Sequence, residues 1–152
     1  MDIPTNYNDL HNHILALKER DLLIEVDRQI DKDSEMHALV RWQFIGGMKE
    51  EERKAFLFTN VVDGKGKKFD IPVLVGGLAA NRSIYSVGMG CSIDDIQTKW
   101  DNAISNPIKP KFVDAAPCHE MVEEGESLSK KGHGLDALPI PISTPGFDSA
   151  PT

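Results

Sequence analysis

Apolar residues recur at two different spacings along the first part of the chain. Leu10, Ile14 and Leu17 lie three and four positions apart, which predicts an amphipathic helix over residues 7–20. Between 22 and 30 apolar residues recur at alternate positions instead, which predicts a strand with one face buried and one face in solvent. Its inward residues are Leu22, Ile24, Val26 and Ile30.

A second helix is expected after a polar turn. Residues 31–34 offer side-chain oxygens for the turn and for a helix cap, and the glycine pair at 46–47 can end the helix. Its apolar stripe is Met36, Leu39, Val40 and Phe44. The apolar runs 55–62 and 71–75 then predict two strands, which a turn at 63–66 would join as a hairpin.

Two more helices are predicted beyond the hairpin. Pro72 cannot donate to a ladder, so it belongs at a strand start or a sheet edge. Residues 82–89 indicate a short helix that ends at Gly90. Ser92, with acidic residues behind it, favours the start of a longer helix, which Pro107 terminates. The predicted buried stripe of that helix is Ile93, Ile96, Trp100 and Ile104.

The last part of the chain has a different composition. Short strand candidates at 112–113 and 121–122 lie in an acidic, turn-rich stretch. The stretch 138–146, together with Pro151, contains four of the nine prolines, so this stretch is extended and cannot be helix interior. We predict an α/β (α+β) fold, in which a small domain over 1–134 has a mixed sheet flanked by helices. The Pro-rich segment at 135–152 would then lead toward a further domain.

Charge and cysteine content exclude several classes of partner. The 152 residues include 17 basic and 24 acidic side chains, a net charge of −7 with histidines neutral. An acidic protein repels phosphate backbones and anionic lipids, so no nucleic-acid or membrane partner is expected. Cys91 and Cys118 are too few for a disulfide framework. Without a signal peptide or a long apolar run at hand, we expect a cytoplasmic protein with reduced thiols.

No residue pattern specifies a reaction. Cys118 and His119 are adjacent, but neighbours in a strand point to opposite faces and no orienting group accompanies them. His11 and His13 are two positions apart on a predicted helix, which also separates their side chains. Zinc requires about four convergent ligands, so we interpret both pairs as structural.

The glycine-rich and acidic strings are equally unspecific. The strings at 76–77, 88–90 and 64–66 match neither phosphate-binding pattern, and the string at 64–66 is interpreted as a hairpin turn. The acidic cluster could attract a divalent cation, but a solvated charge run is the preferred interpretation. Its members are Glu120, Glu123, Glu124 and Glu126. We therefore assign no catalytic, cofactor-binding or metal residue to this chain.

Several strings occur in an order that is typical of one enzyme family. They are Asn8-Asp9-Leu10, Ile24-Glu25-Val26-Asp27, Phe56-Leu57-Phe58-Thr59-Asn60-Val61, Ile71-Pro72-Val73-Leu74, Ala80-Asn81-Arg82 and Asn106-Pro107-Ile108-Lys109-Pro110. The most specific string is Leu138-Pro139-Ile140-Pro141, which is followed by Pro145 and Asp148. On these residues, over about 7–151, the chain resembles the N-terminal portion of the UbiD family of decarboxylases.

This resemblance implies an activity for the complete enzyme. It would be a prenylated-flavin-dependent (de)carboxylase that acts reversibly on an aromatic or α,β-unsaturated carboxylic acid. Prenylated FMN and a divalent metal such as manganese are the implied cofactors, potassium is a further candidate ion, and a homo-oligomer is expected.

The resemblance also limits what this chain can do alone. In the family the flavin, the metal and the catalytic Glu–Arg–Glu residues belong to the domain beyond the Pro-rich segment. We therefore expect the 152 residues to be inactive and to bind none of these cofactors. The expected partner is their own C-terminal flavin domain or a catalytic partner subunit. A separately encoded small subunit and a non-catalytic binding module are the alternatives.

Overall fold

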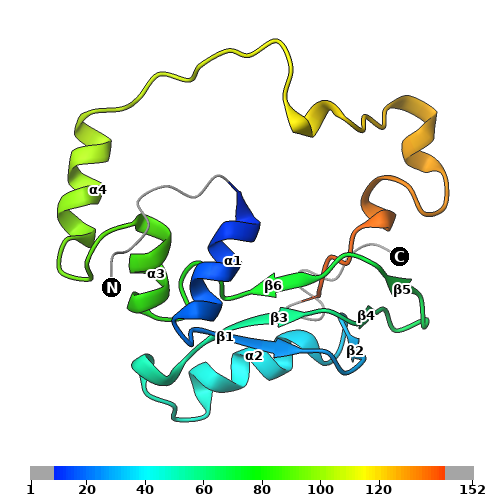
Figure 1. The fold of residues 1–152 in the computed structure, drawn as a ribbon. Helices are drawn as coiled ribbons and strands as arrows, with labels where there is room; N and C mark the ends of the chain where they lie inside the picture. Colours follow the sequence, from blue (N-terminus) through cyan, green and yellow to red (C-terminus); the bar gives the residue numbers. More distant parts are fainter. Residues whose placement is uncertain (1–8, 143–152) are drawn as a thin grey trace.

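The computed structural model describes residues 9–142 (Figure 1). This part of the chain forms four α-helices and two three-stranded sheets, which confirms the predicted α+β class. The helices are α1 (Leu10–Glu19), α2 (Met36–Ile45), α3 (Arg82–Met89) and α4 (Ile96–Ser105). The strands are β1 (Leu23–Val26), β2 (Ile30–Asp31), β3 (Ala55–Phe58), β4 (Val61–Val62), β5 (Lys68–Phe69) and β6 (Val73–Val75). Short 3₁₀ helices occur at Glu50–Glu52, Pro117–His119, Gly125–Ser129 and Gly134–Ala137.

The larger sheet has the order β1-β3-β6, with β3 in the centre (Figure 1). β1 runs parallel to β3, with Ile24 beside Phe56. β6 runs antiparallel to β3, with Val75 opposite Phe56, so the predicted pairing of these two runs is confirmed. Pro72 directly precedes β6 at the sheet edge, where its missing N–H costs no ladder bond.

The smaller sheet continues two of these strands after a bend. β2 follows β1 and β4 follows β3, so each run that was predicted as one strand is divided in two. Backbone pairing persists through the bend, because Thr59 donates to the Val26 carbonyl at 3.1 Å and Ile30 donates to that of Asn60 at 3.0 Å. The Asn60 amide also reaches the Asp27 carbonyl at 3.3 Å. The Asn60 side chain thus forms a hydrogen bond to the neighbouring backbone at the bend between the two sheets.

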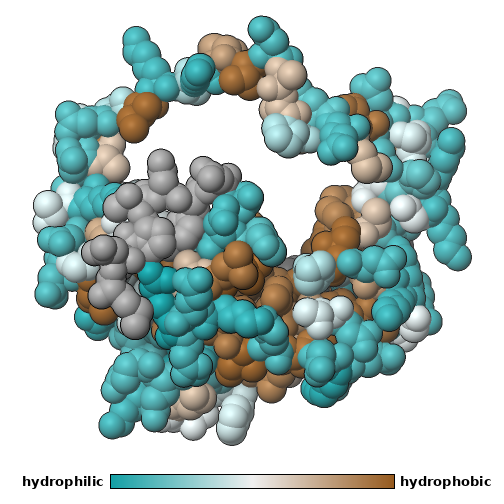
Figure 2. Space-filling model, viewed as in Figure 1, coloured by the Kyte–Doolittle hydropathy of each residue, from teal (hydrophilic) through white to brown (hydrophobic). Residues whose placement is uncertain are grey.

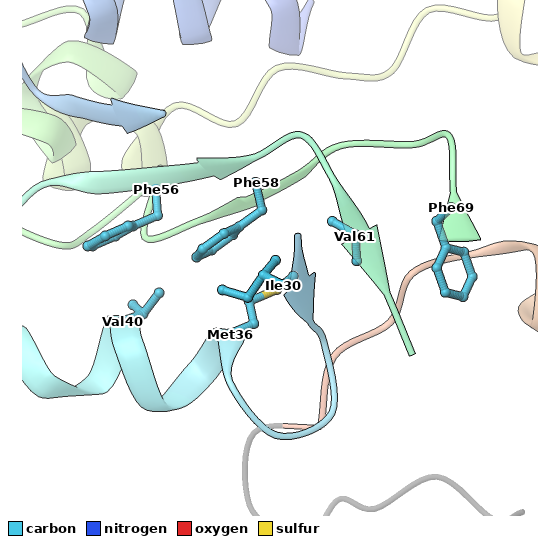
Figure 3. Packing of buried hydrophobic residues seen from close by; sticks show 7 residues of the cluster. All are labelled: Ile30, Met36, Val40, Phe56, Phe58, Val61 and Phe69. Carbon is cyan, nitrogen blue, oxygen red and sulfur yellow. The ribbon is translucent and has the colours of Figure 1, made fainter. Parts of the chain in front are cut away.

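One face of the sheet carries the main apolar cluster (Figure 3). The rings of Phe56 and Phe58 lie stacked, with centroids 5.9 Å apart, and project from β3 toward α2. Met36 and Val40 of α2 meet them, and Ile30 of β2 fills the space beside Met36. Phe58, Met36 and Ile30 have no exposed surface, so burial of this cluster contributes strongly to the stability of the fold.

The other face carries a second cluster beneath α1 and α3. Leu17 and Ile84 are fully buried there and pack with Ala55 of β3. The predicted stripe of α1 is wrong at Leu10, which is 59% exposed, and the buried positions are His13, Ala16 and Leu17. This face of α1 is buried because it contacts α3. The spacing of apolar residues in α1 does not reveal which element will cover it.

The predicted one-sided burial of 22–30 is also wrong. Leu22 and Leu23 both pack against the second cluster, whereas Val26 packs against the first. Ile24 is 40% exposed. β1 lies at the sheet edge and has elements near both faces. Its apolar residues can therefore be buried on either face.

α2 differs from its prediction at one position. Met36 and Val40 are buried as expected and Leu39 packs against them, but Phe44 is 42% exposed. Gln43 is buried in its place, because its amide donates to the Lys54 carbonyl and accepts from the Lys54 N–H, both at 3.0 Å. These two hydrogen bonds fix the end of α2 to the start of β3.

α3 has the predicted bounds and ends at Gly90 as predicted, and its N-terminal cap is Asn81. The Asn81 side chain accepts from the Ile84 N–H at 2.8 Å, which satisfies a free donor at the helix start. Gly90 ends the helix with φ 62°, a left-handed conformation that favours glycine.

α4 exists, but it begins at Ile96 and not at the predicted Ser92, and its predicted burial is wrong. No residue of α4 is buried, and its apolar positions remain between partly and largely exposed. Trp100 is 44% exposed and Ile104 is 72% exposed. The Trp100 indole donates to the Tyr85 hydroxyl at 2.5 Å, which ties α4 to α3 without covering its apolar face. Helical spacing predicts that a face is apolar, but it does not provide the surface that covers it.

Residues 106–134, which we call the arch, leave the body of the molecule (Figure 1). The strands predicted at 112–113 and 121–122 are absent from this described stretch. Phe112 is 95% exposed and Met121 is 81% exposed. The backbone hydrogen bonds of the arch are local turns, such as His119 to Ala116, so no neighbouring strand is at hand to pair with.

The Pro-rich segment returns to the smaller sheet over its described residues, 135–142. Lys67, beside β5, donates through its ammonium to the Asp136 carbonyl, and Pro139 is buried. No helix forms over 138–142, as the prolines require. Residues 143–152 of the predicted connection lie outside the described residues, and the boundary at 134/135 stays a prediction.

The two phenylalanines at positions 58 and 112 test this distribution of burial. Phe58→Ala should lower the free energy of unfolding by about 3–5 kcal/mol, because it opens a cavity in a fully packed cluster. Phe112→Ala removes the same atoms from an exposed site and should change it by less than about 0.5 kcal/mol. Urea titration followed by circular dichroism measures both. Equal losses in the two variants would contradict the described core.

Candidate functional site

The two histidines of α1 lie on different sides of the helix. His11 is exposed, whereas His13 is buried and its Nε2 lies 2.6 Å from the Gly77 carbonyl oxygen. Gly88 of α3 is also close, because a side chain at that position would meet the His13 ring at 3.6 Å. His13 therefore joins α1 to the β6–α3 connection. That contact gives His13 a structural role in the fold.

Cys118 and the acidic cluster both belong to the arch, whereas Cys91 follows the end of α3. Cys118 and His119 belong to an exposed 3₁₀ turn of the arch, and both Cys91 and Cys118 are free thiols. Glu123 accepts hydrogen bonds from the Gly134 N–H and from the His133 ring, both at 2.8 Å. These two bonds lower the pKa of the Glu123 carboxyl. The pair closes a local turn within the arch.

The glycine strings form turns in two of the three places. Asp63 Oδ1 accepts from the N–H groups of Lys65 and Lys67 at 2.9 and 2.8 Å, which shapes the turn before β5. Gly76 has φ 74°, and a side chain there would press on Ala80 at 3.3 Å. Glycine is thus required for conformation and for close packing after β6. Neither string is arranged around a phosphate.

The residue patterns did not reveal a cavity of about 530 Å³ that lies at the start of α3. Its walls come from separate segments: Phe44 of α2, Glu50 and Arg53 before β3, residues between 79 and 85, and residues between 93 and 97. No single string contains more than a part of it. Only the packing of α2, α3 and α4 around the start of β3 brings these side chains together.

Glu50 and Arg82 form the best-defined ion pair of the cavity. The Arg82 guanidinium donates through Nε at 3.1 Å and through Nη2 at 3.3 Å to the two carboxylate oxygens of Glu50. The Arg82 backbone N–H, at the start of α3, adds a third bond at 3.1 Å. The pKa of the Glu50 carboxyl is lowered, first by the hydrogen bond from the Arg82 backbone N–H and then by the Arg82 guanidinium. The positive charge of Arg53 lowers it further.

Arg53 lines the same cavity with few partners of its own. Its guanidinium lies over the Phe44 ring, 5.0 Å from the centroid, and Nη2 donates weakly to the Met48 carbonyl at 3.4 Å. Its Nε is shielded from solvent and has no hydrogen-bond partner. The Asn81 amide, by contrast, holds the Arg53 backbone carbonyl at 2.5 Å. The Arg53 backbone is therefore fixed, whereas most N–H groups of its guanidinium have no acceptor among the described residues.

Exposed apolar side chains gather on α4 and along the arch. Figure 2 shows the arch standing clear of the body, with an open space between them. The most exposed of these side chains are Ile104, Ile108, Phe112, Met121 and Val122. A second hollow, of about 650 Å³, is lined mostly by apolar residues such as Leu10, Leu74 and Leu78. So much uncovered apolar surface indicates an interaction region.

Comparison with known proteins gives one match. A family model of the 3-octaprenyl-4-hydroxybenzoate carboxy-lyase N-terminal domain matches residues 14–104, more than half of the chain. The chain belongs to this family. No curated protein and no solved structure matches it significantly. The matched part of this UbiD N-terminal domain begins inside α1, contains both sheets and ends inside α4.

The match confirms the resemblance and supports a carboxy-lyase as the enzyme class. Within 9–142, no group of three histidine, cysteine or carboxylate side chains is close enough to hold a metal ion. Among the same residues, no helix is both long and apolar enough to cross a membrane.

The Glu50–Arg82 pair makes the stability of the UbiD N-terminal domain depend on pH. A lowered pKa in the folded state means that ionised Glu50 stabilises the fold above its ordinary value of 4.5. This contribution is lost as the pH falls through the folded-state pKa. Glu50→Gln should therefore be less stable than wild type at neutral pH, and the difference should shrink in acid.

Urea titrations from about pH 7 to about pH 3 measure this difference. Glu51→Gln is the matched control, since Glu51 is the neighbouring exposed carboxylate and should show no such pH-dependent gap. A gap for Glu50→Gln that stays constant over the whole range would contradict the role of ionised Glu50.

Proposed function

We propose that this chain is the N-terminal domain of a prenylated-flavin-dependent carboxy-lyase. The complete enzyme would remove or add carbon dioxide, reversibly, on an aromatic or α,β-unsaturated carboxylic acid. The family match over residues 14–104 carries this proposal, because it covers both sheets and most of the four helices. The flavin, the metal and the catalytic groups would belong to the domain that follows.

The exposed apolar surface supports a docking role for this domain. The match ends at residue 104, inside the helix whose apolar face is uncovered. Trp100 and Ile104 lie four residues apart on that helix and continue its apolar face. Leaving such a stripe in water costs free energy, so a partner surface would cover it. We propose the flavin-binding domain of the same enzyme as that partner.

No described residue has a place in the chemical step. Within residues 9–142, no group of three histidine, cysteine or carboxylate side chains could hold a metal ion. The domain would instead contribute surface: it would order the neighbouring domain and shield it from water. We therefore derive no step of the reaction from this chain.

The first test is the binding of prenylated FMN to the isolated 152 residues. We expect no stoichiometric complex by absorbance after gel filtration, because the described residues provide neither a phosphate loop nor a metal cluster. A tight flavin complex would contradict the proposal. Reading the gene past Thr152 gives a second check: an in-frame flavin domain supports it, whereas a stop codon favours a separate subunit or binding module.

Hydrogen exchange tests the docking surface directly. Amides of α4 should exchange at least about tenfold more slowly in the complete enzyme than in the 152-residue chain, since docking restricts local opening. Ile104→Asp in the complete enzyme should remove this protection, because a buried unpaired charge is costly. Thr98→Asp, on an exposed position of the same helix, should retain it. Equal exchange in chain and enzyme would exclude docking on α4.

A further inference from the structure

We propose that the cavity at the start of α3 binds a small monocarboxylic acid with an apolar body, and that Arg53 recognises its carboxylate. This site would be a binding site of the N-terminal domain itself. It does not depend on the carboxy-lyase activity proposed above, and its test uses the isolated chain.

The first argument is the unused hydrogen-bonding capacity of Arg53. A guanidinium has five N–H donors, yet the described partners accept one, at a long 3.4 Å. Its Nε–H is shielded from solvent without an acceptor, and such groups are rare enough in folded proteins to require an explanation. No carboxylate of the described residues forms an ion pair with Arg53. An anion in the cavity would accept from the Nη groups at the end of the Arg53 guanidinium, because Nε itself is covered by the protein.

The second argument is that the nearest carboxylate is already committed. Glu50 accepts three hydrogen bonds from Arg82, two from the side chain and one from the backbone. Its oxygens therefore point to the start of α3 and not to Arg53. The cavity thus contains one arginine with a bidentate partner and one without. The difference between the two identifies Arg53 as the recognising group.

The charges of the walls favour a carboxylate over a phosphate. Glu50 and Asp94 both line the cavity, and Asp94 has no described ion pair to neutralise it. A dianionic phosphate would be repelled by both, whereas a single negative charge beside Arg53 is repelled less. The planar guanidinium also matches the two oxygens of a carboxylate.

The remaining walls indicate the body of the ligand. Phe44 already presents its ring beside Arg53, and Tyr85, Ile93 and Ile96 add apolar surface. The volume of about 530 Å³ lies within the usual range for small-molecule sites. An acid with a single ring would place its carboxylate on Arg53 and its ring against these side chains.

Nuclear magnetic resonance titration of the ¹⁵N-labelled chain with sodium benzoate tests this site. We expect saturable shifts of the Arg53 Nε–Hε signal and of the amides at the start of α3. Benzamide, which has the same shape without the charge, should bind at least about tenfold more weakly. Inorganic phosphate should also be weaker. No saturable shift with benzoate, or equal binding of benzamide or phosphate, would overturn the proposal.

Variants of arginine complete the test. Arg53→Met keeps the length of the side chain and should weaken benzoate at least about tenfold, whereas Arg53→Lys should give an intermediate loss because it lacks the planar fork. Arg41→Met, on an exposed position of α2, is the matched control and should bind like wild type. Dispersed amide spectra establish that each variant is folded. Unchanged affinity in folded Arg53→Met would exclude Arg53 as the recognising residue.

Discussion

Burial of β3 on both faces is the constraint on which the rest of the structure depends. Phe56 and Phe58 fill one face and Ala55 meets the other, so one short strand requires a cover on each side. α2 provides the first cover, and α1 with α3 provides the second. The flanking strands complete its backbone pairing, one parallel and one antiparallel. A central strand of this kind cannot be moved without opening both clusters.

The position of the cavity follows from the same strand. Arg53 and Lys54 directly precede β3, and each is fixed through its backbone. The Asn81 amide donates to the Arg53 carbonyl, and the Gln43 amide bonds both the backbone N–H and the carbonyl of Lys54. The start of β3 is thus tied to α2 on one side and to α3 on the other. The core therefore places a charged side chain where three helices meet. Recognition by Arg53 would use rigidity that folding has already established.

The sequence predicted what depends on local chemistry and missed what depends on contact between distant segments. α3 was placed correctly because Gly90, which ends it, is a local signal. The periodicity of α4 was also correct, yet its burial was not, since Ile104 has nothing to pack against in the described structure. The strand expected at Phe112 failed for a similar reason, because a strand requires a partner. The cavity was missed because its walls come from separate stretches, none with a signature of its own.

α4 connects the two proposed roles. Its first turn lines the cavity through Ile96 and Gln97, while Trp100 and Ile104 on the later turns lie exposed. The bond from Trp100 to Tyr85 holds the helix beside α3, and Tyr85 also lines the cavity. Docking of a flavin domain on the exposed stripe would therefore fix one wall of the carboxylate site. A ligand that orders the same wall would in turn favour docking, because coupling between two sites on one element is reciprocal.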